Sequence, residues 1–123
     1  IPAHNATHVR VNTKLFIDSI ERTSLLITDR LKSPVRCVFD ENTIRISSIT
    51  SLGRANDKID AAVEGNRVEI GFNNRFMLEA LKVVDTDEVR IELNGAVSPI
   101  LILPPEGESF LFLVLPVRLK NEG

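Results

Sequence analysis

The chain repeats one pattern of elements twice, and this repeat limits the folds that it can adopt. Each half begins with a strand, continues with a helix and then has three further strands. The segments VRVNTKLFIDSI and VEIGFNNRFMLEAL hold the same place in the two halves. One such half cannot bury its apolar face alone, so the two halves are expected to pack together. The repeat therefore predicts an α+β domain with two antiparallel sheets and both helices on one side.

The first half is predicted to span residues 9–65, after a linker end over residues 1–8. Its helix cannot continue beyond Pro34, because the residue before a proline is driven out of the helical region. The residues that recur at helical spacing are Phe16, Ile17, Ile20, Ser24 and Ile27. The expected elements are a strand over 9–11, a helix over about 14–28 capped by Asn12 or Thr13, strands over 35–39 and 43–49 joined by a turn, and a polar extended stretch over 53–64.

The second half is predicted to span residues 66–119, and residues 120–123 form a tail. Its helix is capped by Asn73 or Asn74 and runs to about Val84. The side chains expected on the inner face of this helix are Phe76, Met77, Ala80, Leu81 and Val84. The other expected elements are strands over 67–72, 89–93 and 100–103 and a last strand that starts at Phe110.

The composition argues against several classes of protein. A chain of 123 residues suits one domain, and its net charge of −2 does not fit a strongly basic nucleic-acid binder. Tyr and Trp are absent, which argues against a surface that stacks bases. No signal peptide opens the chain, and no apolar run approaches the ~18–20 residues that cross a bilayer.

Catalytic and metal-binding signals are also weak. His4 and His8 lie in the expected linker with no further ligand near them in sequence, so a solvated tail is favoured over a zinc site. Cys37, the only cysteine, is predicted to be a buried structural thiol rather than a nucleophile. The chain contains neither a glycine-rich phosphate loop nor a nucleophile elbow. An unrelated α+β enzyme or ligand-binding domain stays open as the alternative, and a deep polar pocket with convergent titratable groups would favour it.

The segment FLFLVLPVRL, residues 110–119, is the most apolar part of the chain. It lacks the alternation of a half-exposed strand, so both of its faces are expected to be covered, in part by a partner. Pro116 cannot donate to a sheet, so pairing should end there and leave an apolar surface that suits a docked peptide. Leu25, Leu26 and Ile27 end a helix and cannot all face one core, so one of them is expected to be exposed. A helix end tucked under a loop and a subunit contact are the two explanations that stay open.

Three segments together resemble the C-terminal third of the bacterial sliding clamp family, the beta subunit of DNA polymerase III. They are VEIGFNNRFMLEAL, VRIELNGAVSPILILPPEG and the terminal LVLPVRL, and the resemblance covers residues 1–119. It implies a non-catalytic DNA-clamp domain without metal or cofactor, in a cytoplasmic, nucleoid-associated ring of two head-to-tail subunits. The ring would encircle duplex DNA without reading its sequence. Its implied clients are the replicative polymerase, the clamp loader and repair polymerases, which bind through linear motifs, and no membrane is involved.

The resemblance also implies roles for individual residues. A pocket for a short Gln/Leu/Phe-type peptide, shared with the preceding domain, would use Leu31, Asn73, Phe76, Val97, Pro99, Leu113, Val114, Leu115, Pro116, Val117, Arg118 and Leu119. Leu25 and Leu26 match the apolar pair of the dimer interface. The candidates to face DNA are Lys14, Arg22, Arg75 and Lys82; ordinary charge pairs on a solvated helix face are the alternative for them.

Overall fold

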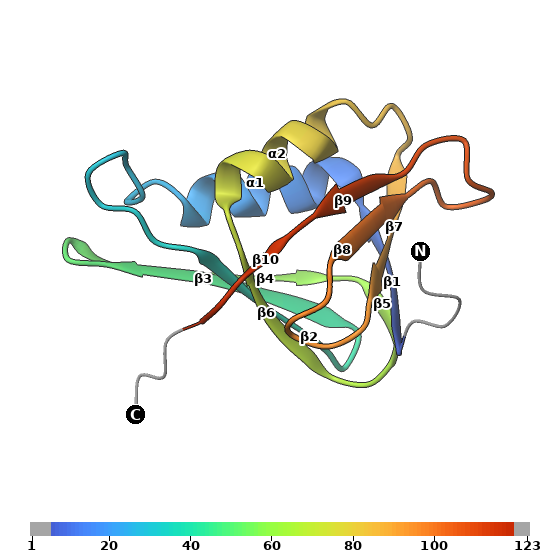
Figure 1. The fold of residues 1–123 in the computed structure, drawn as a ribbon, viewed down its shortest axis with the longest axis horizontal. Coiled ribbons are helices and arrows are strands. Elements are labelled where there is room, and N and C mark those ends of the chain that lie inside the picture. The colour runs from blue at the N-terminus through green and yellow to red at the C-terminus, as the bar shows by residue number, and fades with distance from the viewer. Residues whose placement is uncertain (1–5, 120–123) are drawn as a thin grey trace.

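The computed structural model describes residues 6–119, which form two five-stranded antiparallel sheets and two helices. Sheet A has the strand order β5-β1-β7-β8-β9, and sheet B has the order β10-β6-β2-β3-β4. Figure 1 shows both helices on the same side of the sheets. The elements are β1 (Thr7–Asn12), α1 (Thr13–Thr23), β2 (Val35–Asp40), β3 (Thr43–Thr50), β4 (Gly53–Asp60), β5 (Ala62–Gly65), β6 (Val68–Phe72), α2 (Asn74–Lys82), β7 (Glu88–Leu93), β8 (Ile100–Leu103), β9 (Phe112–Val114) and β10 (Pro116–Val117).

The internal repeat is confirmed, with one more strand in each half than predicted. Each half is a strand, a helix and four strands, because the extended stretch 53–64 divides into β4 and β5 and the terminal run divides into β9 and β10. Each sheet takes the first and last strands of one half and the three middle strands of the other. The two halves are thus interlocked, and neither sheet can form from one half alone.

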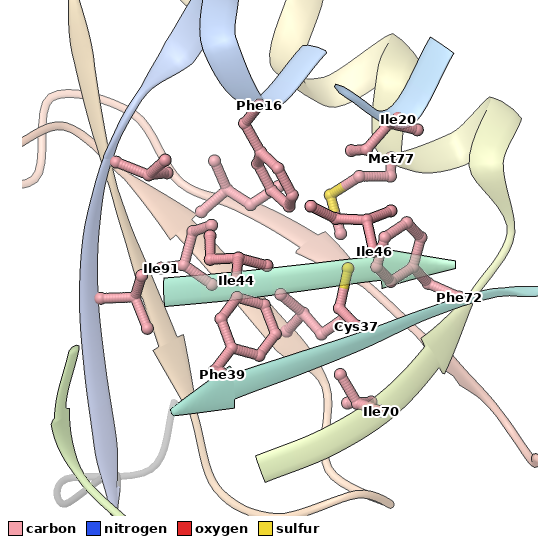
Figure 2. Packing of buried hydrophobic residues seen from close by; sticks show 14 of the residues in the cluster. Phe16, Ile20, Cys37, Phe39, Ile44, Ile46, Ile70, Phe72, Met77 and Ile91 are labelled. Carbon is pink, nitrogen blue, oxygen red and sulfur yellow. The ribbon is translucent and has the colours of Figure 1, made fainter. Parts of the chain in front are cut away.

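The core lies between the helices and the inner faces of the two sheets (Figure 2). Phe16 and Ile20 reach it from α1, and Met77 and Leu81 reach it from α2. In β2 the burial alternates along the strand, so that every second side chain points inward. Burying one large apolar side chain stabilises a fold by about 1.5–3 kcal/mol, so this shared core holds both halves together.

Each helix starts as predicted and ends earlier. The Asn12 side chain accepts a hydrogen bond from the Leu15 N–H at 2.8 Å, and the Asn73 side chain accepts one from the Phe76 N–H at 3.1 Å. The prediction that α1 continues to about Thr28 is wrong, because the helix ends at Thr23 with Ser24 as its cap. The Thr28 hydroxyl accepts hydrogen bonds from the N–H groups of Arg30 and Leu31 and so holds the next residues in a turn.

The first strand begins two residues earlier than predicted. Thr7 is buried in β1, and its hydroxyl donates a 2.6 Å hydrogen bond to the Asn66 carbonyl. His8 also lies in β1, with Nδ1 2.7 Å from Glu92 Oε1, so the prediction of a solvated tail is wrong for this histidine. His4 and the tail over 120–123 lie outside the described residues. Within residues 6–119 no helix is long and apolar enough to cross a membrane.

Candidate functional site

Large apolar side chains are exposed where the chain leaves sheet A. Among them, Leu113 in β9 and Leu115 after it are 58% and 71% exposed, and Phe76 on α2 is 60% exposed. The cover of the terminal run is thus incomplete within this domain, and the part of it assigned to a partner stays a prediction. Strand β9 is the last strand of sheet A; Val114 is buried in the core and Phe112 packs against it, whereas Leu113 between them points outward. Phe76 was also predicted to face inward, and it lies instead on the outer face of its helix.

The terminal run crosses from one sheet to the other at Leu115. Strand β9 pairs with β8 as far as Val114, and β10 pairs with β6 from Pro116 onward. Pairing with β8 ends before Pro116, as predicted, but its resumption on the other sheet was not predicted. Strand β10 is an edge strand, which is where a proline without an N–H donor is tolerated. The crossing leaves the apolar side chains around β10 at the surface.

A hollow of about 380 Å³, which we call the α2 hollow, lies beside β10. It is lined by residues 27–29 and 32–34 of the loop after α1, by residues 73–75 at the start of α2, and by Val117. The Asn73 side-chain oxygen already accepts a hydrogen bond as the cap of α2. The side-chain N–H groups of Asn73 are therefore the groups that can bind a ligand. The Arg75 guanidinium contacts Asp29 Oδ1 at 3.1 Å and so joins the two walls of the hollow.

A second, smaller hollow of about 170 Å³ lies on the other side of Val117, and we call it the Gly71 hollow. Its lining includes Val97, Val117, Arg118 and Leu119. Gly71 permits this arrangement, because a Cβ there would lie 2.7 Å from the Val117 carbonyl oxygen and 2.5 Å from Leu119 Cδ2. The absence of a side chain in β6 therefore lets β10 lie flat against it.

The four cations predicted to face DNA all have acidic partners. Lys14 contacts Asp18 on the next turn of α1 at 3.1 Å, and Lys82 contacts Glu21 across the two helices at 3.1 Å. Arg22 reaches Asp57 of β4 at 2.7 Å, and Arg75 is paired with Asp29 as described above. The alternative of ordinary charge pairs thus describes these side chains well. Positive charge on the helices is largely compensated within the domain.

Asp57 accepts hydrogen bonds from two different side chains. Hydrogen bonds from the Arg22 guanidinium and from the Ser19 hydroxyl, each 2.7 Å long, lower the pKa of Asp57 from its ordinary value. A carboxyl whose pKa falls on folding stabilises the fold above its unfolded pKa of about 3.9. That stabilisation disappears as the pH falls through the lower folded pKa.

Replacing Asp57 with asparagine should therefore reduce stability in a pH-dependent way. At pH 7 we expect a loss of about 1 kcal/mol in the free energy of unfolding, typical of a partly exposed ion pair with an added hydrogen bond. The loss should shrink as the pH is lowered from 7 through the folded pKa of Asp57, since the carboxyl then becomes neutral. Urea unfolding over this pH range measures the change, and a loss of the same size at every pH would contradict the role of the charge.

The segment after α1 presents one leucine to solvent. Leu25 is 78% exposed, whereas Leu26 is half-buried beside the β3–β4 hairpin, where a Cβ on Gly53 would lie 3.7 Å from Leu26 Cδ1. The prediction that one residue of this apolar triplet is exposed is confirmed. Because the triplet follows the helix instead of ending it, Leu25 stands at the surface of the domain.

Comparison with known proteins decides between the two interpretations of the fold. Residues 1–118 match the family model of the DNA polymerase III beta subunit, C-terminal domain. The chain belongs to this family. The beta sliding clamp of Bacillus subtilis is 37% identical over 121 residues, which make up 96% of this chain and 32% of that protein. The chain therefore spans about a third of the length of the curated clamps that it matches.

Solved clamp structures superpose closely on this clamp domain. The Bacillus subtilis clamp aligns with 98% of this chain and 32% of its own at a TM-score of 0.92 and 36% identity. The Thermotoga maritima beta subunit aligns with 98% of this chain and 33% of its own at 0.91 and 29%. A Bartonella birtlesii clamp bound to griselimycin aligns with 97% of this chain and 32% of its own at 0.89 and 28%. The family is one of non-catalytic subunits, which removes the enzymatic alternative.

The structure leaves most of the twelve residues assigned to the peptide pocket at the surface of the clamp domain. Those that line the two hollows are Asn73, Val97, Val117, Arg118 and Leu119, and those that are exposed without lining either hollow are Phe76, Pro99, Leu113 and Leu115. Leu31 and Pro116 are half-buried. Val114 is 3% exposed and belongs to the core, so it does not line the site.

Sequence reasoning missed one wall of the α2 hollow. Residues 27–29 and 32–34 were placed partly in a helix, although Thr28, Asp29, Ser33 and Pro34 form a cluster typical of a loop. Within residues 6–119 there is no group of three His, Cys, Asp or Glu side chains that could hold a metal ion. Cys37 is buried as predicted, and burial raises the pKa of its thiol well above the ordinary value, which keeps it unreactive.

Proposed function

We propose that this domain is the client-binding, ring-closing third domain of a replicative sliding clamp, a processivity factor for DNA polymerase III. The observation that carries the proposal is the group of exposed apolar side chains at α2, β9 and β10. Soluble domains rarely leave such side chains together without a partner. Their positions coincide with those that the family resemblance assigns to a peptide pocket.

The proposed ligand is a short peptide motif of the Gln/Leu/Phe type from a client protein. Its apolar side chains would enter the two hollows on either side of Val117, which lines both of them. The Asn73 amide and the Arg118 guanidinium are the groups that could bind its polar atoms. Such a motif would bind as an extended segment with side-chain anchors, a common mode of peptide recognition. The preceding domain of the full-length protein would complete the pocket.

The proposed contact with DNA is weak because of the charges on the helix surface. Lys14, Arg22, Arg75 and Lys82 would face duplex DNA in the ring, but each is already paired with a carboxylate. A phosphate would have to compete with that carboxylate, which limits the gain from counterion release. Loose contact of this kind suits a ring that slides, and a cytoplasmic, nucleoid-associated location follows from the same proposal.

A primer-extension assay with the full-length protein tests the proposal. The assay contains a clamp loader, DNA polymerase III and a primed circular template. Adding the full-length protein should increase the length of DNA that the polymerase makes in one binding event. A product length that does not change when the protein is added would contradict the proposed function.

The ring requires a contact between subunits, and Leu25 is the residue best placed for it. In the full-length protein, Leu25→Asp should convert the head-to-tail dimer to monomer at micromolar concentration, because it would bury an unpaired charge. The side chain is 78% exposed, so the domain itself should fold normally. Sedimentation velocity measures the change. A matched control is Val83→Asp at the end of α2, 64% exposed, and equal dimerisation of the two variants would refute the role of Leu25.

A further inference from the structure

A third hollow, of about 450 Å³, shares the loop residues 32–34 with the α2 hollow. Its floor is formed by the outward-facing side chains of β2 and β3, where Arg36 and Ser47 stand directly opposite each other in the register. Residues 117–119 form the side next to β10. We call it the basic hollow, because Lys32, Arg36 and Arg118 line it together with the hydroxyl residues Ser33, Ser47, Thr50 and Ser51.

The charge of this hollow contrasts with that of the rest of the domain. None of the described residues that line it is acidic, although the chain has a net charge of −2. Arg36 forms an ion pair with Glu69, but Lys32 and Arg118 form none with residues 6–119. The four cations assigned to the helices are all paired. Uncompensated positive charge therefore accumulates beside β10 and not over the helices.

Neighbouring strands extend the same positive surface. Arg45 of β3 and Lys58 of β4 face each other in the register, where like charges directly opposite are unfavourable for the sheet. Arg54 lies farther along β4 on the same face, opposite Ile49. Together with Arg36, these three cations outnumber Asp40, Asp60 and Glu69, which lie on the same face by the same alternation, so the face has an excess of positive charge that attracts anions.

The basic hollow is continuous with the proposed peptide site. Lys32, Ser33, Pro34 and Val117 line both the basic hollow and the α2 hollow. An extended chain that leaves the α2 hollow over Pro34 and Val117 would therefore enter the basic hollow next. The charge and hydroxyl groups found there suit carboxylates, which accept hydrogen bonds and pair with Lys and Arg.

We infer that the basic hollow binds a carboxylate-rich segment of the client polypeptide, next to the motif that fills the apolar site. This inference rests on the proposed function, because the motif delivers the acidic segment to the hollow. A nucleic-acid strand is the competing occupant. Continuity with the peptide site favours the polypeptide, and the basic hollow would then select among clients that carry similar motifs.

Labelled peptides and the full-length protein provide the test. One peptide carries a Gln/Leu/Phe-type motif alone, and the others carry it with a run of glutamates or of serines added at either end. With salt at about 50 mM, the better glutamate peptide should bind about fivefold more tightly than its serine counterpart, as expected for a few exposed ion pairs. At about 500 mM salt the difference should fall to within about twofold.

Two variants locate the effect. Ser47→Glu puts a carboxylate opposite Arg36 in the hollow and should abolish the advantage of the glutamate peptide, while binding of the motif alone stays unchanged. Thr43→Glu adds the same charge to the same face of β3, outside the hollow, and should preserve the advantage.

The outcomes separate the two proposals. If the motif alone does not bind, the proposed function fails. If it binds but glutamates add nothing, or if Ser47→Glu and Thr43→Glu behave alike, the basic hollow has no such role. A single-stranded oligonucleotide that binds the wild type and not Ser47→Glu, with no gain from glutamates, would overturn the inference in favour of nucleic acid.

Discussion

Replacing Gly71 with alanine should weaken binding of a Gln/Leu/Phe-type peptide by at least about tenfold, the loss expected when a central binding pocket is deformed. The added Cβ would lie 2.7 Å from the Val117 carbonyl oxygen, a backbone atom that cannot rotate away. Strand β10 has only two paired residues, so it should move before β6 does. Fluorescence anisotropy with a labelled peptide and the full-length protein measures the loss.

Gly107→Ala provides the control for Gly71→Ala. Gly107 has a φ of +71° and no atom within 4 Å of an added Cβ, so alanine there should reduce stability by about 1–2 kcal/mol through backbone strain. Peptide affinity should not change, because Gly107 lies in the loop after β8, away from both hollows. Gly71→Ala should show the opposite pattern, with little change in melting temperature. Wild-type affinity in Gly71→Ala would mean that the position of β10 does not determine the site.

Replacing Phe16 with alanine should reduce the free energy of unfolding by about 3–5 kcal/mol, a large part of the stability of a typical domain. Phe16 is fully buried, and it enters the core that both halves of the repeat share (Figure 2). The neighbouring Leu15 is 39% exposed, so Leu15→Ala should reduce stability by less than about 1 kcal/mol. Urea unfolding of both variants measures the difference, and equal losses would show that α1 does not anchor the core.

The repeat and the core could be predicted because they depend on local patterns. Alternating side chains mark the inner face of β2, and the asparagine caps mark where α1 and α2 begin. The division of 53–64 between β4 and β5, and of the terminal run between β9 and β10, could not be predicted in this way. Periodicity shows which side chains are buried, but it does not show which sheet a strand joins.

The site was predicted less well for the same physical reason. Phe76 is apolar and occurs at helical spacing, so it resembled a core residue, yet it lies on the outer face of α2. Val114 was assigned to the site and lies in the core. A side chain kept exposed for a partner follows the same local pattern as one that is buried in its own fold. Only the tertiary structure separates the two cases, since Val114 is buried from the edge strand β9 and Phe76 is exposed on α2.

Peptide binding to full-length Val117→Glu tests the central claim most directly, because Val117 lines every hollow in the proposed site. The matched control is Val83→Glu, the same substitution at a 64% exposed position at the end of α2. With a labelled Gln/Leu/Phe-type peptide, Val117→Glu should bind at least about thirtyfold more weakly than the wild type, as expected for a central apolar anchor. Val83→Glu should bind as the wild type does. Equal binding by Val117→Glu and the wild type would contradict the assignment of this surface as the client-binding site.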